Sequence, residues 1–257
     1  MIYDVQMPNY IDFIQQNYRL AEKGSSDESF LSSEDLLDTY ATEKFVNEQL
    51  KPLLNAPNGL VTASQFSKRY AFSVITPFFA SLTLFDRVLN MNPDNCELHR
   101  DPDKGILLPR LSLKDETTDI VGSNREAEIH RALEAVFKGH IKKVWQTLNA
   151  SASAPLPVLW ENTAIYFYWL YETNFYNHEL NVADDKIEQD FEIILNAPGE
   201  CFGENDNPLA KFHHPKQTLL QSNPPVRVRK TCCLYYEVNQ ERNFCKTCPR
   251  CLSGYTE

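Results

Sequence analysis

The residues most able to do chemistry are cysteines near the C-terminal end of the chain. Five of the seven cysteines fall between positions 232 and 251, as an adjacent pair, a gap of eleven residues and two overlapping C-x-x-C steps. Thiolates concentrated at one end of an otherwise cysteine-poor chain are typical of a metal or redox centre. The five are Cys232, Cys233, Cys245, Cys248 and Cys251.

Spacing alone leaves several interpretations of these thiols open. A structural zinc site usually takes its ligands from two C-x-x-C-like knuckles, whereas Cys232 and Cys233 have no spacer between them. A 2Fe–2S cluster contains two irons that each need two ligands, so it accepts more varied spacings of four thiolates. Reduced thiols without any metal are the third interpretation. Disulfides are disfavoured because the chain is large, shows no secretory signal and has an odd number of cysteines.

The segment R-V-R-K-T-C-C-L-Y-Y, followed by C-x-x-C-P, resembles the C-terminal signature of the FhuF-like ferric-siderophore reductases. The signature of that family is Cys-Cys-x10-Cys-x2-Cys, which binds one 2Fe–2S cluster. Carried over by position, the resemblance implies that the cluster ligands are Cys232, Cys233, Cys245 and Cys248. This chain departs from the signature in its gap of eleven residues and in Cys251, which forms a second C-x-x-C and is an alternative ligand.

The resemblance continues more weakly upstream and implies an activity. Trp160 and Asn162 match a Leu-Trp-x-Asn motif, and positions 207–209 match an Asn-Pro-Leu motif. The implied reaction is one-electron reduction of siderophore-bound Fe(III), which releases iron because hard oxygen ligands hold Fe(II) weakly. No catalytic residue beyond the cluster is implied, and hydroxamate, catecholate and citrate-type siderophores all stay open. The rival interpretation is a zinc-stapled binding protein without redox activity.

Charge is distributed unevenly along the chain of 257 residues. Its net charge is −10, which argues against nucleic acid as the main partner. Residues 211–257, however, contain eight basic and three acidic side chains, so this end carries +5 and the remainder −15. Basic side chains near an anionic cluster would offset its charge and could dock a substrate or an acidic electron donor. The candidates for such docking are Arg227, Arg229 and Lys230.

An external electron donor is required, because the sequence contains no G-x-G-x-x-G and no P-loop. A ferredoxin or a flavin reductase would serve. The uncharged run at positions 70–85 is sixteen residues and falls short of a transmembrane helix. Together with the absence of an export signal, this predicts a cytoplasmic protein without a transmembrane segment.

Hydrophobic periodicity predicts an α+β fold that is predominantly helical, with a β-hairpin. The resemblance implies, in addition, a small C-terminal cysteine-rich iron–sulfur segment. Three parts are expected: an N-terminal helical segment (1–60), a substrate-binding core (61–220) and a cluster segment (221–257). The hairpin is expected over 96–113, with Pro109 on an edge strand. Helices are expected at 8–22, 34–51, 63–90, 126–148, 159–176 and 184–195.

Several polar residues receive a structural interpretation. Thr62 and Gln65 form a capping-box pattern for the aromatic-rich helix at 63–90, which should be central and buried. Asn162 lies near the expected start of a helix and is interpreted as its cap. His130 and His140 have no Glu or Cys at metal-site spacing, so they are expected on the surface or its rim.

Overall fold

The structure is a computed structural model that describes residues 9–22, 29–101, 103–177, 180, 182–219 and 222–251. The α-helices are α1 (Tyr10–Asn17), α2 (Thr39–Lys44), α3 (Lys51–Leu54), α4 (Gly59–Phe85), α5 (Arg125–Leu133), α6 (Lys142–Ala152), α7 (Leu156–Glu172), α8 (Asp184–Asn196) and α9 (Pro208–Phe212). The strands are β1 (Ser29–Ser32), β2 (Arg87–Leu89), β3 (Cys96–Asp101), β4 (Gly105–Leu113), β5 (Thr118–Ile120), β6 (Gln217–Leu219) and β7 (Ser222–Val226). The predominantly helical α+β fold is therefore confirmed.

Shorter helical turns join these elements. Two are π-helical, η2 (Phe45–Leu50) and η4 (Glu134–Ile141), and each continues the helix on either side of it. The 3-10 turns are η1 (Asp35–Leu37), η3 (Pro93–Asn95), η5 (Asn174–Tyr176), η6 (Gly199–Phe202), η7 (Tyr235–Glu237) and η8 (Pro249–Cys251).

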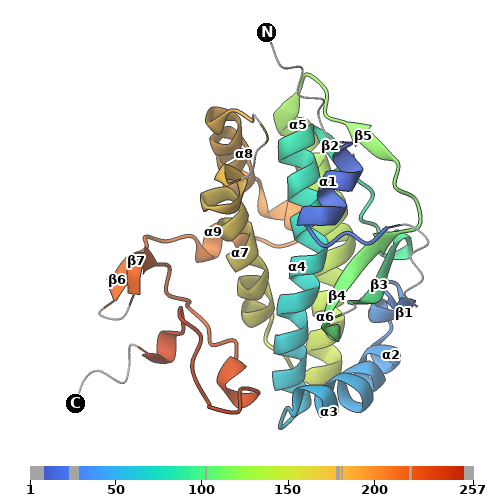
Figure 1. Ribbon diagram of the computed structural model, residues 1–257, viewed down its shortest axis with the longest axis vertical. Helices are drawn as coiled ribbons and strands as arrows, with labels where there is room; N and C mark the ends of the chain where they lie inside the picture. Colours follow the sequence, from blue (N-terminus) through green and yellow to red (C-terminus); the bar gives the residue numbers. More distant parts are fainter. Residues whose placement is uncertain are drawn as a thin grey trace.

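Helix α4 is the central element, as predicted, and other elements surround it (Figure 1). Apolar side chains occupy most of its circumference, which suits a helix buried on all sides. The predicted capping box is wrong. Asn58 caps the helix instead, by accepting from the N–H of Val61, and Gln65 is directed to another part of the molecule.

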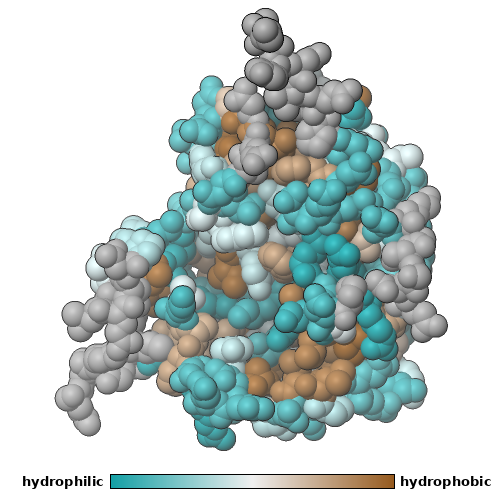
Figure 2. Space-filling model, in the orientation of Figure 1, coloured by the Kyte–Doolittle hydropathy of each residue, from teal (hydrophilic) through white to brown (hydrophobic). Residues whose placement is uncertain are grey.

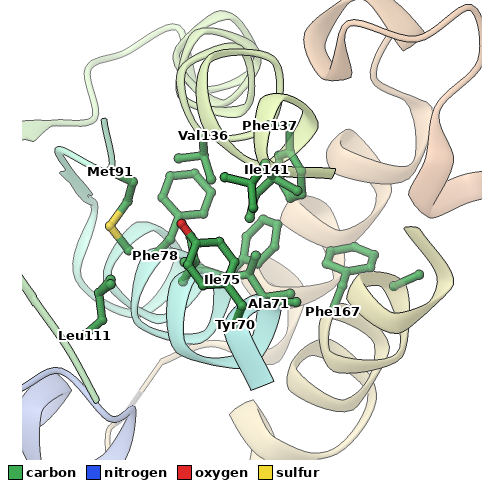
Figure 3. Close-up of a cluster of buried hydrophobic side chains, with 14 of the residues drawn as sticks. Tyr70, Ala71, Ile75, Phe78, Met91, Leu111, Val136, Phe137, Ile141 and Phe167 are labelled. Carbon is green, nitrogen blue, oxygen red and sulfur yellow. The ribbon is translucent and has the colours of Figure 1, made fainter. Parts of the chain in front are cut away.

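The main hydrophobic core lies where α4 meets α7 and the π-helical turn η4 (Figure 3). Phe79 of α4 contacts Phe167 at 5.3 Å and Phe137 at 6.0 Å between ring centroids. Burying three such rings removes a large apolar area from water and fixes α7 against α4. Helices α4 and α7 therefore form a rigid frame that can position any segment bound by their polar side chains.

The predicted hairpin is confirmed as β3 and β4, which pair antiparallel. In the three-stranded sheet the order is β1-β3-β4, so Pro109 lies on an edge strand as expected. The third strand, β1, comes from a segment about seventy positions upstream of β3 and was not predicted, nor was the pairing of β2 with β5. These strands are three or four residues long, too short for a clear alternating pattern.

Two further expectations are wrong. The helix expected to end at Lys51–Pro52 continues to Leu54, because proline is tolerated in the first turn of α3. His140, expected at the surface, is completely buried. Its Nδ1 donates to the carbonyl of Met91, which can only accept, and its Nε2 therefore accepts from the Tyr70 hydroxyl.

Among the helices of the described residues, none combines the length and apolar character needed to cross a bilayer.

Candidate functional site

The C-terminal cysteines lie in a segment that packs beside α4 and α7 (Figure 1). Cys233 and Cys248 are buried, at 1% and 2% exposed, whereas Cys232 and Cys245 are partly exposed. The sulfur atoms of Cys233 and Cys245 are 3.9 Å apart. The N–H of Cys248 donates to the carbonyl of Cys245 and closes the C-x-x-C turn. The side chain of Cys251 lies outside the described part of the structure.

The spacing between the Cys233 and Cys245 sulfurs suits two ligands of one tetrahedral metal, since metal–sulfur bonds of about 2.3 Å separate such sulfurs by about 3.8 Å. Thiolate ligands select iron–sulfur clusters or zinc. The remaining geometry is less convergent: the Cys232 sulfur accepts the N–H of Leu234 at 3.5 Å. Within the described residues, no three Cys, His, Asp or Glu side chains are arranged around a common metal position. The Cys233 and Cys245 thiols thus lie side by side, and Cys232 and Cys248 lie in the same segment.

Electrostatics favour the thiolate, which is the metal-binding form of cysteine. The hydrogen bond between the Cys233 and Cys245 thiols, followed by the positive charges of Lys68 and Arg229, lowers the pKa of Cys233 to about 5. Burial alone would raise it. The same hydrogen bond raises the pKa of Cys245. Cys233 is therefore the more readily ionised of the two.

Helix α4 supplies three polar contacts to Cys233. The hydroxyl of Ser64 and the amide of Gln65 both donate to its carbonyl oxygen, at 2.8 Å and 2.6 Å. Lys68, one turn further along, places its Nζ 3.9 Å from the Cys233 sulfur. Burial lowers the pKa of this lysine, and the nearby thiol opposes that effect. One face of α4 thus holds both the backbone and the sulfur of the same cysteine.

Helix α7 holds the residues just before Cys232. The buried carboxylate of Glu161 accepts hydrogen bonds from the backbone N–H groups of Lys230 and Thr231, each at 2.7 Å, and from the Thr231 hydroxyl. Charge-assisted hydrogen bonds to a buried carboxylate are about twice as strong as neutral ones. Glu161 therefore determines how the chain enters the cysteine pair.

Asn162 connects the two helices to this segment and is not a helix cap. It lies within α7 and is fully buried. Its Nδ2 donates to the carbonyl of Ser64 and the hydroxyl of Ser67 on α4, while its Oδ1 accepts from Arg229 at 2.6 Å. The expectation of a cap was wrong because α7 begins at Leu156, so Asn162 lies in the second turn of the helix.

The three predicted docking residues occupy different environments. Arg227 forms a two-point ion pair with Glu172, at 2.7 Å and 3.1 Å, and lies over the ring of Tyr168. Arg229 is buried, at 4% exposed, and reaches Asn162 and Glu161. Lys230 is exposed and donates to the carbonyl of Lys211. Only Lys230 of the three therefore presents its charge directly to solvent.

The sequence did not show that Glu161, Ser64, Gln65 and Lys68 contact the cysteine segment. One signal was available: four polar residues, Thr62, Ser64, Gln65 and Ser67, lie within the first turns of a helix predicted to be buried. Buried polar groups require partners, so these residues indicated a polar contact. They did not indicate which segment would make that contact.

Fold and site together define a helical scaffold whose two central helices hold a thiolate-rich C-terminal segment. Two family models match the chain. Residues 64–227, more than half of it, match the family described as ferric iron reductase FhuF-like transporter, and residues 229–250 match the FhuF 2Fe-2S C-terminal domain. The chain therefore belongs to the FhuF-like ferric iron reductase family, which confirms the resemblance. Membership supports an iron–sulfur cofactor and an oxidoreductase role related to siderophore iron.

One solved structure similar to this chain is the aerobactin synthetase IucC from a hypervirulent pathotype of Klebsiella pneumoniae. The two share 13% identity with a TM-score of 0.40, and the match covers 57% of this chain. It spans only 30% of the synthetase. No curated protein matches the chain.

Proposed function

We propose that this protein reduces siderophore-bound Fe(III) to Fe(II), one electron at a time, through a 2Fe–2S cluster held by Cys232, Cys233, Cys245 and Cys248. When bound, such a cluster accepts a single electron and passes it on. The observation that carries the proposal is the pair of sulfurs of Cys233 and Cys245, 3.9 Å apart, within the stretch that matches the 2Fe-2S domain.

The contacts around the cysteines support this proposal. Glu161 and Asn162 hold the approach to the pair, while Ser64, Gln65 and Lys68 hold Cys233. Rigid support on two packed helices keeps ligands in place while the charge of the site changes. A positive Lys68 beside a thiolate also stabilises the reduced, more negative state of the site.

The electron comes from an external donor, a ferredoxin or a flavin reductase, and leaves with the iron. The donor is oxidised by one electron and Fe(III) is reduced to Fe(II), which its hard oxygen ligands then release. Exposed cations near the cysteines suit an acidic donor protein; they include Lys230, Arg242, Lys246 and Arg250. In this proposal residues 61–220 are the substrate-binding core, 221–257 the cluster segment and 1–60 an N-terminal helical segment. The reaction takes place in the cytoplasm, where thiols stay reduced.

The test is anaerobic purification followed by visible and electron paramagnetic resonance spectroscopy, with assays of iron and acid-labile sulfide. We expect a red-brown protein that bleaches with dithionite and that reduces a ferric siderophore when supplied with reduced ferredoxin, as a ferrous-iron trap would report. Serine variants of Cys232, Cys233, Cys245 and Cys248 should lose the cluster, whereas Cys201→Ser is the matched control. A colourless protein with one equivalent of zinc would exclude the reductase and support the alternative, a zinc-stapled binding protein without redox activity. If Cys251→Ser loses the cluster and Cys248→Ser keeps it, the ligand set is wrong.

A further inference from the structure

A pocket of about 520 Å³ lies between α7 and the chain that leads into the cysteines. Small-molecule sites typically measure about 300–1,000 Å³. Figure 2 shows a hollow between the C-terminal segment, on the left, and the helical body, with apolar side chains around it. We call this the α7 pocket. Its lining includes Phe72, Tyr166, Trp169, Arg227, Arg229 and Thr247.

One wall of the α7 pocket is aromatic and open to solvent. Phe72 contacts Tyr166 at 4.9 Å and Trp169 at 5.9 Å between ring centroids. Trp169 is 38% exposed, whereas Trp145 and Trp160 are 0% and 5% exposed. A large aromatic surface left open at the mouth of a pocket is typical of a binding site.

Charged side chains line another part of the pocket. Lys216, Arg227 and Arg229 bring three positive charges, and Glu161 and Glu172 bring two negative ones, so the lining carries a net charge of +1. Arg229 is buried, and its guanidinium is held by Asn162 and by Glu161, whose Oε2 lies 3.6 Å from its Nε. An excess of positive charge favours a neutral or anionic ligand over a cationic one.

The opposite wall belongs to the cysteine segment itself. Thr247 lies between Cys245 and Cys248, and its carbonyl accepts the backbone N–H of Arg229 at 2.8 Å. A molecule in the pocket would therefore rest against the backbone of the C-x-x-C turn. The carboxylates of Glu161 and Glu172, which also line it, are already held by ion pairs with arginines. Because these carboxylates are already paired, they would not compete with a bound chelate for its iron.

We propose that the α7 pocket binds the ferric chelate, with the organic framework on the wall formed by Phe72, Tyr166 and Trp169. This inference rests on the proposed function, because it assigns the place where that substrate binds. The position against Thr247 brings the iron next to the C-x-x-C turn, which is where an electron would have to leave the chain.

A second hollow of about 480 Å³ lies on the other side of the site, lined by Lys68, Arg69, Lys104 and Tyr235 among others. It also borders Cys233, through Lys68. Its Lys68 is already directed to the Cys233 sulfur, and its lining has two aromatic side chains where that of the α7 pocket has five. For these reasons the chelate is assigned to the α7 pocket, and the second hollow is the alternative that the experiment must exclude.

The experiment measures binding without reduction. Gallium(III) has the charge and nearly the size of Fe(III) but does not accept an electron from such a protein. Gallium(III) complexes of a trihydroxamate, a tricatecholate and citrate are titrated into the full chain by calorimetry. We expect at least one complex to bind, and Trp169→Ala and Phe72→Leu to weaken that complex at least tenfold. Lys104→Ala, in the second hollow, is the matched control and should leave its affinity unchanged.

Trp169 and Phe72 are partly exposed, so their variants should fold, and circular dichroism checks this. The proposal fails if no gallium complex binds, or if Lys104→Ala weakens binding and the two aromatic variants do not. Its failure can be told apart from that of the proposed function. If the Trp169→Ala variant reduces ferric chelates with an unchanged KM, the reductase function stands and the α7 pocket is not its substrate site. If gallium complexes bind and binding requires Trp169, but the protein reduces no iron, the α7 pocket is a binding site and the proposed reductase function is wrong.

Discussion

The Oδ1 of Asn162 accepts a 2.6 Å hydrogen bond from the guanidinium of Arg229, and this contact links α7 to the segment that carries the cysteines. The same side chain donates to α4 through its Nδ2. One buried amide thus holds three parts of the chain, and a change there should affect both stability and the cysteine site.

Asn162→Ala should lower the free energy of unfolding by about 2–3 kcal/mol, because it leaves a buried guanidinium and two α4 groups without their partner. Urea denaturation measures the stability, and the iron content after anaerobic purification measures the site. Asn196→Ala is the control, since Asn196 is exposed and bonds only within its own helix. Equal stability of the two variants would contradict the linking role.

Lys68→Met should lower the midpoint potential of the proposed cluster by tens of millivolts, because it removes a positive charge 3.9 Å from the Cys233 sulfur. A redox titration followed by visible absorption measures this. Lys68→Arg keeps the charge and should retain most of the potential. If Lys68→Met leaves the potential where it was while the cluster stays intact, the lysine does not act on the site.

Acidification should destabilise the protein through His140. Burial lowers the pKa of His140 from 6.5 to about 4. As the pH falls from 6.5 toward 4, the unfolded chain takes up a proton that the folded chain refuses, so unfolding becomes easier by up to about 3 kcal/mol. Urea denaturation between pH 7 and pH 4.5 measures this loss. His140→Gln should be less stable at pH 7 but lose less on acidification; an equally steep loss would exclude His140 as its source.

Asp190→Asn should lower the free energy of unfolding by about 2–3 kcal/mol, because Asp190 is fully buried and pairs through both oxygens with Arg125, at 2.5 Å and 2.6 Å. The change removes a charge-assisted pair inside the protein and leaves Arg125 paired with Asp86. Glu134→Gln, which breaks the exposed pair with Lys138, is the control and should have no measurable effect. Urea denaturation compares the two, and similar losses would contradict this difference.

Local features were readable from the sequence. The aromatic run of α4, the hairpin at 96–113 and the helix α8 follow from patterns within a single segment. The strand β1 and the buried state of His140 were not readable, because each depends on partners from distant parts of the chain.

The sequence by itself determined the chemistry: the number, type and spacing of the C-terminal cysteines, since ligand spacing is a local property of the chain. Only the tertiary structure decided which residues hold those cysteines. Lys68 meets Cys233 across 165 positions, and Glu161 meets Thr231 across seventy. Contacts of that kind arise from how α4 and α7 pack against each other and against the C-terminal segment, and no local pattern encodes that packing.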